Sequence, residues 1–288
     1  MLAAMTVTGK VVFITGGGAG VGAEVARRLH AKGAKLVLTD VDTNALAATK
    51  AALGGEPLTV VADVRDPSAM RAAADTAVRH FGGIDVVLAN AGVLAFGSAQ
   101  NMDPESFKRV IDINVSGAFN TVHATLPAII AHRGYVLVVS SLAAFTAAPG
   151  LSAYHASKAG VEQFANTLRV EVKHLGVAVG SAHMSWIDTA MVQDAKSELG
   201  AFREMVAKLP PPLNRTTSVH QCGAAFVKGI EGRKTRIYCP GWVGAFRWVR
   251  PVVSSSLGER AVDNLAADIL PKLDAEVAAL ARPAIGPA

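Results

Sequence analysis

The chain has 288 residues, of which 51% are hydrophobic and 18% are charged, and its formal net charge is +5. This length and apolar content allow a large core and argue against a disordered chain. No block of Lys and Arg is long enough to suggest a nucleic-acid arm, and no apolar run reaches the roughly 20 residues that span a bilayer. We therefore expect no nucleic-acid partner and no transmembrane segment.

Strand-like apolar runs alternate with helical patterns along most of the chain. The expected strands cover residues 10–16, 35–40, 57–64, 84–92, 135–141, 177–185 and 235–240. The expected helices cover residues 23–33, 44–53, 68–82, 104–131 and 153–173, with Pro104 near the start of the long fourth helix. Continuous apolar strands that alternate with helices are typical of a parallel sheet covered on both faces. The sequence thus predicts an α/β fold with a doubly wound parallel sheet.

A glycine-rich loop, TGGGAGVG at residues 15–22, joins the first expected strand to the first expected helix. Glycines at such a place let the backbone turn tightly and approach a pyrophosphate, and the helix N-terminus offers free N–H groups to the anion. A glycine-rich turn alone is weak evidence, so the strand–loop–helix context carries the prediction. The expected dinucleotide contacts in this loop are Gly16, Gly18, Gly20, Val21 and Gly22.

Asp40 ends the second expected strand, about 20 residues beyond the loop, where a carboxylate can accept hydrogen bonds from the adenosine ribose. The alternative is an ordinary helix cap. A carboxylate at this position repels a 2′-phosphate, and no Arg or Lys lies within the loop or directly after Asp40. NAD is therefore favoured as the cofactor, and NADP is the alternative.

Tyr154 and Lys158 are four residues apart in the stretch SAYHASKAG, so they share one face of the fifth expected helix. An ammonium about 4 Å from a phenolate stabilises it by roughly 4 kcal/mol at an effective dielectric near 20, which equals about 3 pKa units. We therefore expect the pKa of Tyr154 to be lowered toward working pH, where general acid–base catalysis is most efficient. Hydride transfer between an alcohol and a nicotinamide needs such a group, because the hydroxyl proton has to move.

Five motifs occur in one order along the chain: TGGGAGVG, NAG at 90–92, NVSG at 114–117, Ser141, and YHASK at 154–158. Over about residues 8–240 the chain thereby resembles the short-chain dehydrogenase/reductase family, in the form with TGxxxGxG and YxxxK motifs. The resemblance implies a Rossmann fold, NAD-linked hydride transfer and a catalytic set of Asn114, Ser141, Tyr154 and Lys158.

The resemblance also implies a role for each of these residues. Ser141 would bond the substrate oxygen, Asn114 would hold a water in a proton relay, and Lys158 would also donate to the nicotinamide ribose. Ser140 is the rival for the role of Ser141, although successive strand residues point to opposite faces. His155, beside Tyr154, is expected to be incidental or to line the pocket.

Further cofactor contacts follow from the same resemblance: Asp63, Val64, Asn90, Ala91, Gly92, Ile187 and Thr189. Asp63 and Val64 would lie near the adenine, and Ile187 and Thr189 near the nicotinamide carboxamide. Asn90 has a purely structural role as its alternative. The family usually carries Pro-Gly before the last segment, and Met184-Ser185 stands there instead.

We expect one dinucleotide-binding catalytic domain over residues 1–240, with a substrate lid at about 190–215, and a C-terminal helical extension over 241–288 packed on it. A stripe at helical spacing begins the extension, where Pro251 should break or kink the helix. The stripe comprises Trp242, Phe246, Val249 and Val253. Three interpretations stay open: packing on the core or over the substrate mouth, a subunit contact, or an interfacial membrane helix. Under the first, lid and extension build an apolar pocket.

The sequence therefore predicts an NAD-dependent oxidoreductase that acts on a bulky, lipophilic secondary alcohol or ketone. The alternatives are an NADP-linked carbonyl reductase of the same fold and a catalytically silent NAD-binding regulatory protein. A homodimer or homotetramer is expected, with no metal because the eight histidines form no metal-ligand pair. Cys222 and Cys239 lack metal or redox spacing, and the first ten residues are too short and polar for a signal peptide, so a cytoplasmic protein with reduced thiols is expected.

Overall fold

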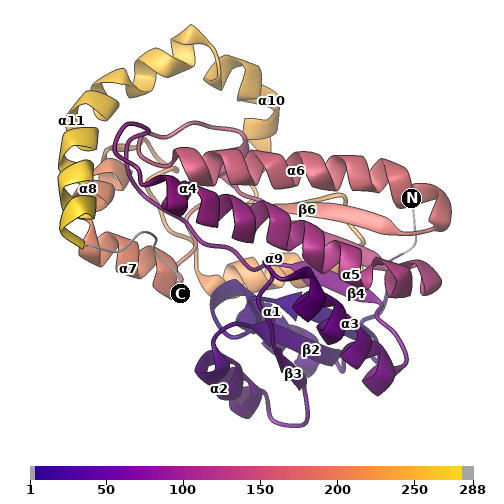
Figure 1. The fold of residues 1–288 in the computed structure, drawn as a ribbon. Coiled ribbons are helices and arrows are strands. Elements are labelled where there is room, and N and C mark those ends of the chain that lie inside the picture. The colour runs from indigo at the N-terminus through magenta and orange to yellow at the C-terminus, as the bar shows by residue number, and fades with distance from the viewer. Residues whose placement is uncertain (1–3, 281–288) are drawn as a thin grey trace.

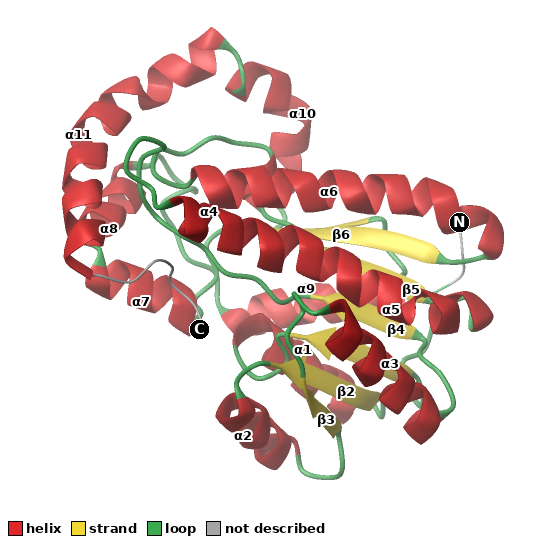
Figure 2. Cartoon of the chain, viewed as in Figure 1, coloured by secondary structure: helices red, strands yellow, loops and turns green. Residues whose placement is uncertain are grey.

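A seven-stranded parallel sheet forms the centre of the computed structural model, which describes residues 4–280 (Figures 1 and 2). The strands are β1 (Val11–Thr15), β2 (Lys35–Asp40), β3 (Leu58–Val61), β4 (Val86–Ala89), β5 (Tyr135–Val139), β6 (Ala178–Met184) and β7 (Arg236–Cys239). They lie in the order β3-β2-β1-β4-β5-β6-β7, and each neighbouring pair is parallel. The predicted doubly wound parallel sheet is confirmed.

Helices cover both faces of this sheet. One face carries α1 (Gly20–Ala31), α2 (Thr43–Leu53) and α9 (Val219–Glu231), and the other carries α3 (Pro67–Phe81), α4 (Pro104–Ile111), α5 (Gly117–Ala131) and α6 (Ser152–Val172). Strand β1 shows the division, because Ile14 packs with Leu29 and Phe226 on one face and Phe13 packs with Met70 on the other. Both faces of the strand are therefore apolar, as its continuous hydrophobic run predicts.

The long helix between β4 and β5 contains a π-helical turn, Asp112–Ser116, between α4 and α5. The N–H of Gly117 donates to the carbonyl of Asp112, five residues back. The sequence predicted one regular helix here, so this turn is a local departure. Such turns insert one extra residue and re-aim the side chains around it, and they often occur near functional sites.

The extension forms an arch beyond the carboxyl ends of the strands, built from α10 (Val243–Val253) and α11 (Ser256–Leu280) (Figure 1). It packs against α8 (Gly200–Lys208), which follows α7 (Ala190–Glu198) in the expected lid segment. Phe202 and Met205 of α8 contact a cluster that includes Ile269 and Leu273 of α11. Pro251 lies inside α10, which ends two residues later, and residues 281–288 of the expected extension lie outside the described residues.

Polar contacts fix α11 on two sides. The carboxylate of Asp274 accepts hydrogen bonds from the N–H and hydroxyl of Ser98, each at 2.7 Å, and from the Asn101 amide at 2.8 Å. The carboxylate of Glu276 accepts from the N–H of Ala201 at 2.9 Å, in the first turn of α8. Helix α11 thus joins the segment after β4 to the segment after β6.

Because of these contacts, we expect the extension to be part of the same folded unit, and Leu273→Ala tests this. Leu273 is 1% exposed, and a Leu→Ala change in a core costs about 2–5 kcal/mol. The loss should loosen α11 before it unfolds the sheet, so limited proteolysis should cut the variant within residues 241–280 at protease levels that spare the wild type.

Val252→Ala is the matched control, because Val252 is 56% exposed and should tolerate truncation. Equal protease resistance of Leu273→Ala and wild type would show that the packing of α11 on α8 does not hold the extension in place.

Candidate active site

A cleft of about 1210 Å³ lies where the carboxyl ends of the strands meet the lid and the extension. Most of the residues that the sequence singles out line it: Gly16, Gly20, Val21, Asp40, Asp63, Val64, Asn90, Ala91, Gly92, Ser141, Tyr154, Lys158, Ile187 and Thr189. Three others do not line it, namely Gly18, Gly22 and Asn114. The fold therefore brings the predicted cofactor and catalytic residues to one place.

The N-terminus of α1 is open toward this cleft. Gly16 has a φ of +63°, and a Cβ on Gly22 would lie 2.1 Å from the Gly16 carbonyl oxygen, so the helix can start this close to the loop only without a side chain there. Ala19 precedes the helix without a side-chain cap, and the first turn holds no acidic residue, whereas Asp42 caps α2. Uncapped N–H groups of this kind fit an anionic pyrophosphate.

Asp40 faces the loop from the end of β2. One carboxylate oxygen accepts from the N–H of Gly18 at 3.0 Å, and the other accepts from the N–H of Asp42 at 3.2 Å. The cap of α2 is Asp42 itself, which accepts from the N–H groups of Asn44 and Ala45 at 2.9 and 3.0 Å. The alternative that Asp40 is the helix cap is therefore wrong.

The expected adenine end of the cleft holds an ion pair that the sequence analysis missed. The guanidinium of Arg65 donates to Asp63 at 2.6 and 2.8 Å, and it holds the pKa of that carboxyl below its usual range. Both side chains line the cleft. Arg65 follows Asp63 by only two residues, and no spacing rule distinguishes such a pair from two solvated charges.

Asn90 links β4 to the glycine loop. Its side-chain amide donates to the carbonyls of Thr15 and Gly16 at 3.0 and 3.1 Å, and its N–H donates to the Thr15 hydroxyl at 3.1 Å. Asn90 also lines the cleft. The structural role that stood as its alternative is thus present, beside a position where a cofactor contact is possible.

Helix α6 carries Tyr154 and Lys158 on the side that faces the cleft. Lys158 is 4% exposed, and its Nζ donates to the carbonyl of Val139 at 3.1 Å. The same nitrogen lies 5.5 Å from the centroid of the Tyr154 ring. The four-residue spacing therefore brings the two side chains together, with the lysine anchored on the last residue of β5.

Ser141 lies in the cleft directly after β5. Its hydroxyl donates to the carbonyl of Met184 at 3.2 Å and accepts from the N–H of Ala143 at 3.1 Å. Ser140, by contrast, is fully buried and donates to the carbonyl of Lys158 at 2.9 Å. Ser140 is therefore part of the support of α6, and Ser141 is the hydroxyl available to a ligand.

Burial dominates the titration of the two central groups. It raises the pKa of Tyr154, which a hydrogen bond from Ser141 only partly opposes, and it lowers the pKa of Lys158 to about 8. In the protein without cofactor, burial of Tyr154 therefore outweighs the neighbouring ammonium, and a lowered pKa in the presence of the oxidised nicotinamide stays a prediction. The amine has no carboxylate partner to offset its own burial, so its charge is itself disfavoured in this environment.

Asn114, in the π-helical turn, lies behind the wall of the cleft. Its amide accepts from the N–H of Val93 at 2.8 Å and donates to the Val93 carbonyl and the Ser157 hydroxyl, each at 2.9 Å. A Cβ on Gly92 would lie 3.2 Å from the Asn114 Oδ1 and 3.4 Å from the Lys158 Nζ. The lack of a side chain on Gly92 thus leaves room for the side chains of Asn114 and Lys158 to approach the backbone here.

The segment after β6 keeps its place without the usual Pro-Gly pair. The N–H of Ser185 donates to the carbonyl of Cys239 at 3.0 Å, and Ile187 pairs with Thr217 in a parallel bridge. The N–H of Thr189 then donates to the Ile187 carbonyl at 2.8 Å, just before α7. Contacts to β7 and to Thr217 therefore hold the backbone of this segment, where Met184-Ser185 stands in place of Pro-Gly.

The other end of the cleft is apolar and is built largely by the lid and the extension. Its lining includes Leu142, Leu151, Trp186, Met191, Leu209, Leu213, Phe246, Val253 and Leu265. Of the predicted stripe, Phe246 and Val253 line the cleft, Trp242 packs beside Phe246 with ring centroids 5.9 Å apart, and Val249 is 43% exposed. The sequence analysis did not predict Trp186 as a lining residue, because its position depends on how the lid packs over the sheet.

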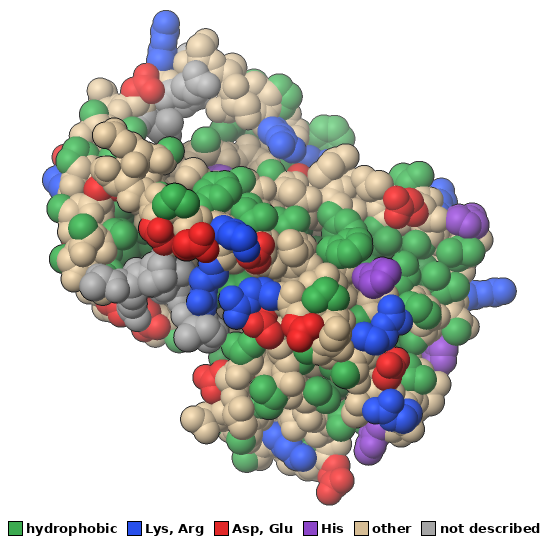
Figure 3. All heavy atoms as spheres, viewed as in Figure 1, with side chains coloured by type: hydrophobic (Ala, Val, Ile, Leu, Met, Phe, Trp, Pro, Cys, Tyr) green, Lys and Arg blue, Asp and Glu red, His purple; other side chains and the backbone are tan. Residues whose placement is uncertain are grey.

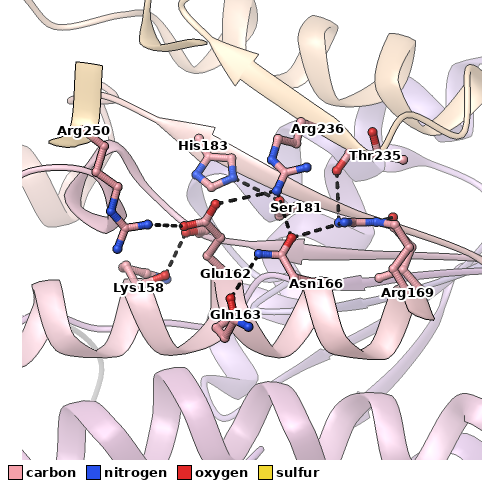
Figure 4. A network of polar contacts seen from close by, with 12 residues as sticks. Lys158, Glu162, Gln163, Asn166, Arg169, Ser181, His183, Thr235, Arg236 and Arg250 are labelled. Carbon is pink, nitrogen blue, oxygen red and sulfur yellow. Dashed lines mark hydrogen bonds and ion pairs between the residues drawn. The ribbon is translucent and has the colours of Figure 1, made fainter. Parts of the chain in front are cut away.

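Helix α10 is joined to α6 by a buried carboxylate, one turn beyond Lys158 (Figure 4). Glu162 is 5% exposed, and its oxygens lie 3.5 Å from the Arg250 guanidinium of α10 and 3.9 Å from that of Arg236 on β7. Burial raises the pKa of Glu162, and the nearby arginines oppose that shift. The helix that carries Tyr154 thus also anchors the extension.

His183, Cys222 and Cys239 are buried and do not line the cleft. Burial lowers the pKa of His183 to about 4, so it is a neutral core residue near the end of β6. Over residues 4–280, no group of three or more His, Cys, Asp or Glu side chains is placed to hold a metal ion, and no helix is long and apolar enough to cross a membrane.

Comparison with known proteins agrees with this geometry. Residues 10–200 match the family model described as short chain dehydrogenase. A cyclohexanol dehydrogenase from an Acinetobacter species is 33% identical over 192 residues, which are 64% of this chain and 76% of that protein. The crystal structure of levodione reductase has a TM-score of 0.76 at 29% identity, with 83% of this chain and 98% of that chain covered.

A second solved structure, that of NAD+-bound xylitol dehydrogenase, has a TM-score of 0.73 at 26% identity and covers 79% of this chain and 94% of that chain. The family match covers well over half of the chain, and it includes the glycine loop and both residues of the YxxxK motif. The chain therefore belongs to the short-chain dehydrogenase/reductase family of oxidoreductases.

Proposed function

We propose that the protein interconverts a bulky, lipophilic secondary alcohol and its ketone, with NAD as the hydride carrier. The observation that carries the proposal is the position of Ser141, Tyr154 and Lys158 in the same cleft as the open N-terminus of α1. A catalytically silent NAD-binding protein would have no use for a buried lysine amine beside a phenol, so this alternative is less favoured.

In the proposed reaction, the hydroxyl of Ser141 holds the substrate oxygen, and the Tyr154 oxygen takes the hydroxyl proton when the alcohol is oxidised. A bound oxidised nicotinamide would supply the hydride acceptor for the carbinol carbon. Lys158 would hold the cofactor ribose and its charge would favour the phenolate form of Tyr154, while the Val139 carbonyl keeps the ammonium in place. Asn114 supports the wall behind Lys158 through its bonds to Val93 and Ser157.

The preference for NAD over NADP follows from charge at the end of β2. Asp40 lines the cleft and would accept from the adenosine ribose hydroxyls while repelling a 2′-phosphate. Arg65 is the cation nearest in sequence that lines the same region, but two of its nitrogens are bonded to Asp63. Because of these contacts the Arg65 guanidinium is poorly placed to bind the 2′-phosphate of NADP, which supports NAD as the cofactor.

The proposed substrate class rests on the size and lining of the cleft. Single small-molecule sites usually measure about 300–1,000 Å³, so a cleft of about 1210 Å³ has room for more than a small alcohol beside the cofactor. The walls that Trp186, Phe246 and Leu265 contribute are apolar. One relative is named cyclohexanol dehydrogenase, which supports a cyclic or similarly bulky substrate.

Tyr154→Phe tests the proposed chemistry on a panel of alcohols that runs from ethanol to bulky cyclic secondary alcohols, with NADH absorbance as the readout. The wild type should show higher kcat/KM for the bulky members, and the variant should lose about 10²- to 10⁴-fold in kcat, since it lacks the proton-transfer group. NAD affinity should change little in this variant, whereas Lys158→Ala should lose both turnover and affinity.

Tyr238→Phe serves as the control, because Tyr238 does not line the cleft. Near wild-type turnover in Tyr154→Phe would refute the mechanism, and higher kcat/KM for ethanol than for the bulky alcohols would refute the substrate class.

Asp40→Ala and Asp40→Asn test the cofactor choice. Hydrogen bonds to a charged group contribute about 1.5–3 kcal/mol, so kcat/KM with NAD should fall roughly 10- to 100-fold relative to its value with NADP. The alanine variant should also lose some affinity for both cofactors, because the N–H of Gly18 loses its acceptor. Asp42→Ala is the control, since Asp42 caps α2 two residues away; a preference that shifts equally in all three variants would mean that Asp40 does not set it.

We also propose a homodimer or homotetramer that pairs through the face formed by α4, α5 and α6. Figure 3 shows apolar side chains over α5 and α6. The ring of Phe119 on α5 is 49% exposed and lies 6.0 Å from that of Phe164 on α6, and Val170 of α6 is 78% exposed. Exposed apolar surface of this kind marks interaction sites.

Light scattering tests this face. The double variant Phe119→Asp with Val170→Asp should lower the particle mass to that of one chain. Val61→Asp should not, because Val61 is an exposed residue on β3, away from this face. An unchanged mass in the double variant would exclude this face.

A further inference from the structure

His155 is held in one tautomer by two backbone carbonyls. Its Nδ1 lies 2.9 Å from the carbonyl oxygen of Ala143 and 2.6 Å from that of Thr146. A carbonyl oxygen can only accept a hydrogen bond, so Nδ1 carries the proton. Burial lowers the pKa of His155, which keeps the ring neutral near pH 7. The opposite nitrogen, Nε2, is therefore an unprotonated hydrogen-bond acceptor.

His155 lies at the end of the cleft that we assign to the substrate. His155 lines the cleft beside Tyr154, as do Leu142, Thr146 and Leu151. Within the part of the chain that the structure describes, Nδ1 has two hydrogen-bond partners and Nε2 has none. An acceptor in a wall that is otherwise largely apolar attracts a ligand that can donate a hydrogen bond there.

We propose that His155 is a specificity residue that accepts a hydrogen bond from a second hydroxyl of the substrate, through Nε2. This inference rests on the proposed dehydrogenase function and narrows its substrate class from a bulky alcohol to a bulky alcohol with a further hydroxyl. The reacting hydroxyl remains with Ser141 and Tyr154. A site built to bond a substrate hydroxyl rejects the analogue that lacks it, because the acceptor would otherwise be left unpaired.

The test compares cyclohexanol with the 1,2-, 1,3- and 1,4-cyclohexanediols at saturating NAD, as kcat/KM of the full-length protein. At least one diol should exceed cyclohexanol by about fivefold to tenfold in the wild type. In His155→Asn this ratio should fall below about twofold, because the amide can still donate to Ala143 and Thr146 but has no acceptor at the Nε2 position. The loss should appear mainly in KM, since the bond forms away from the reacting carbon.

His155→Gln places an amide oxygen near the Nε2 position and should restore part of the ratio, and His174→Asn, on the surface, should leave it unchanged. A ratio near one for every diol in the wild type, or a ratio that persists in His155→Asn, would overturn the inference while leaving the dehydrogenase function standing. Failure of the wild type to oxidise any of these alcohols would instead refute the proposed function itself.

Discussion

The parallel pairing of β1 with β4 is the constraint on which the site depends. Chain order reverses there, since β2 follows β1 on one side and β5 follows β4 on the other. The helix after β1 therefore packs on one face of the sheet and the helices after β4 pack on the opposite face. The two departing segments leave a crevice between them at the carboxyl ends of the strands, which is where open α/β sheets bind ligands. Asn90 bridges the crevice at its base by bonding the carbonyls of Thr15 and Gly16.

Electrostatics then divides the cleft into two unlike halves. The half near β1 and β2 offers backbone N–H groups and the carboxylate of Asp40, which suits the phosphates and ribose of a dinucleotide. The half near the lid is largely apolar, although Lys208 and Asp268, which form an ion pair, also line it. Ser141 and His155 in this half are held by hydrogen bonds to backbone groups. Lys158 lies between these two halves, and it is buried without a carboxylate partner among the described residues. Its positive charge can therefore stabilise a negative charge that develops nearby, such as the phenolate of Tyr154.

The sequence predicted much of this molecule because its strongest signals are local. The runs that became β1, β2, β5 and β6 are continuously apolar, and the spacing between Tyr154 and Lys158 is fixed by one helical turn. The cap of α2 shows the limit of such signals. Asp40 and Asp42 are the same residue type two positions apart, so the sequence alone does not tell which of them caps the helix. In the structure the Asp42 side chain is the cap.

What could not be predicted depends on tertiary packing. The π-helical turn around Asn114 has no sequence pattern of its own, and the raised pKa of Tyr154 comes from burial that spacing does not reveal. The helical stripe of the extension left three interpretations open, and it could not separate Phe246 and Val253, which line the cleft, from Trp242, which does not. The spacing of apolar residues predicts which side of a helix is apolar, but only the folded structure shows which residues pack against that side.

The arch formed by α10 and α11 supplies one wall of the cleft, so this wall is built from residues 243–280. The glycine loop and the Tyr154–Lys158 pair come from residues that precede β7, so the two ends of the cleft are built from separate parts of the chain. A change in α10 or α11 can therefore alter the apolar wall without touching the loop at the N-terminus of α1.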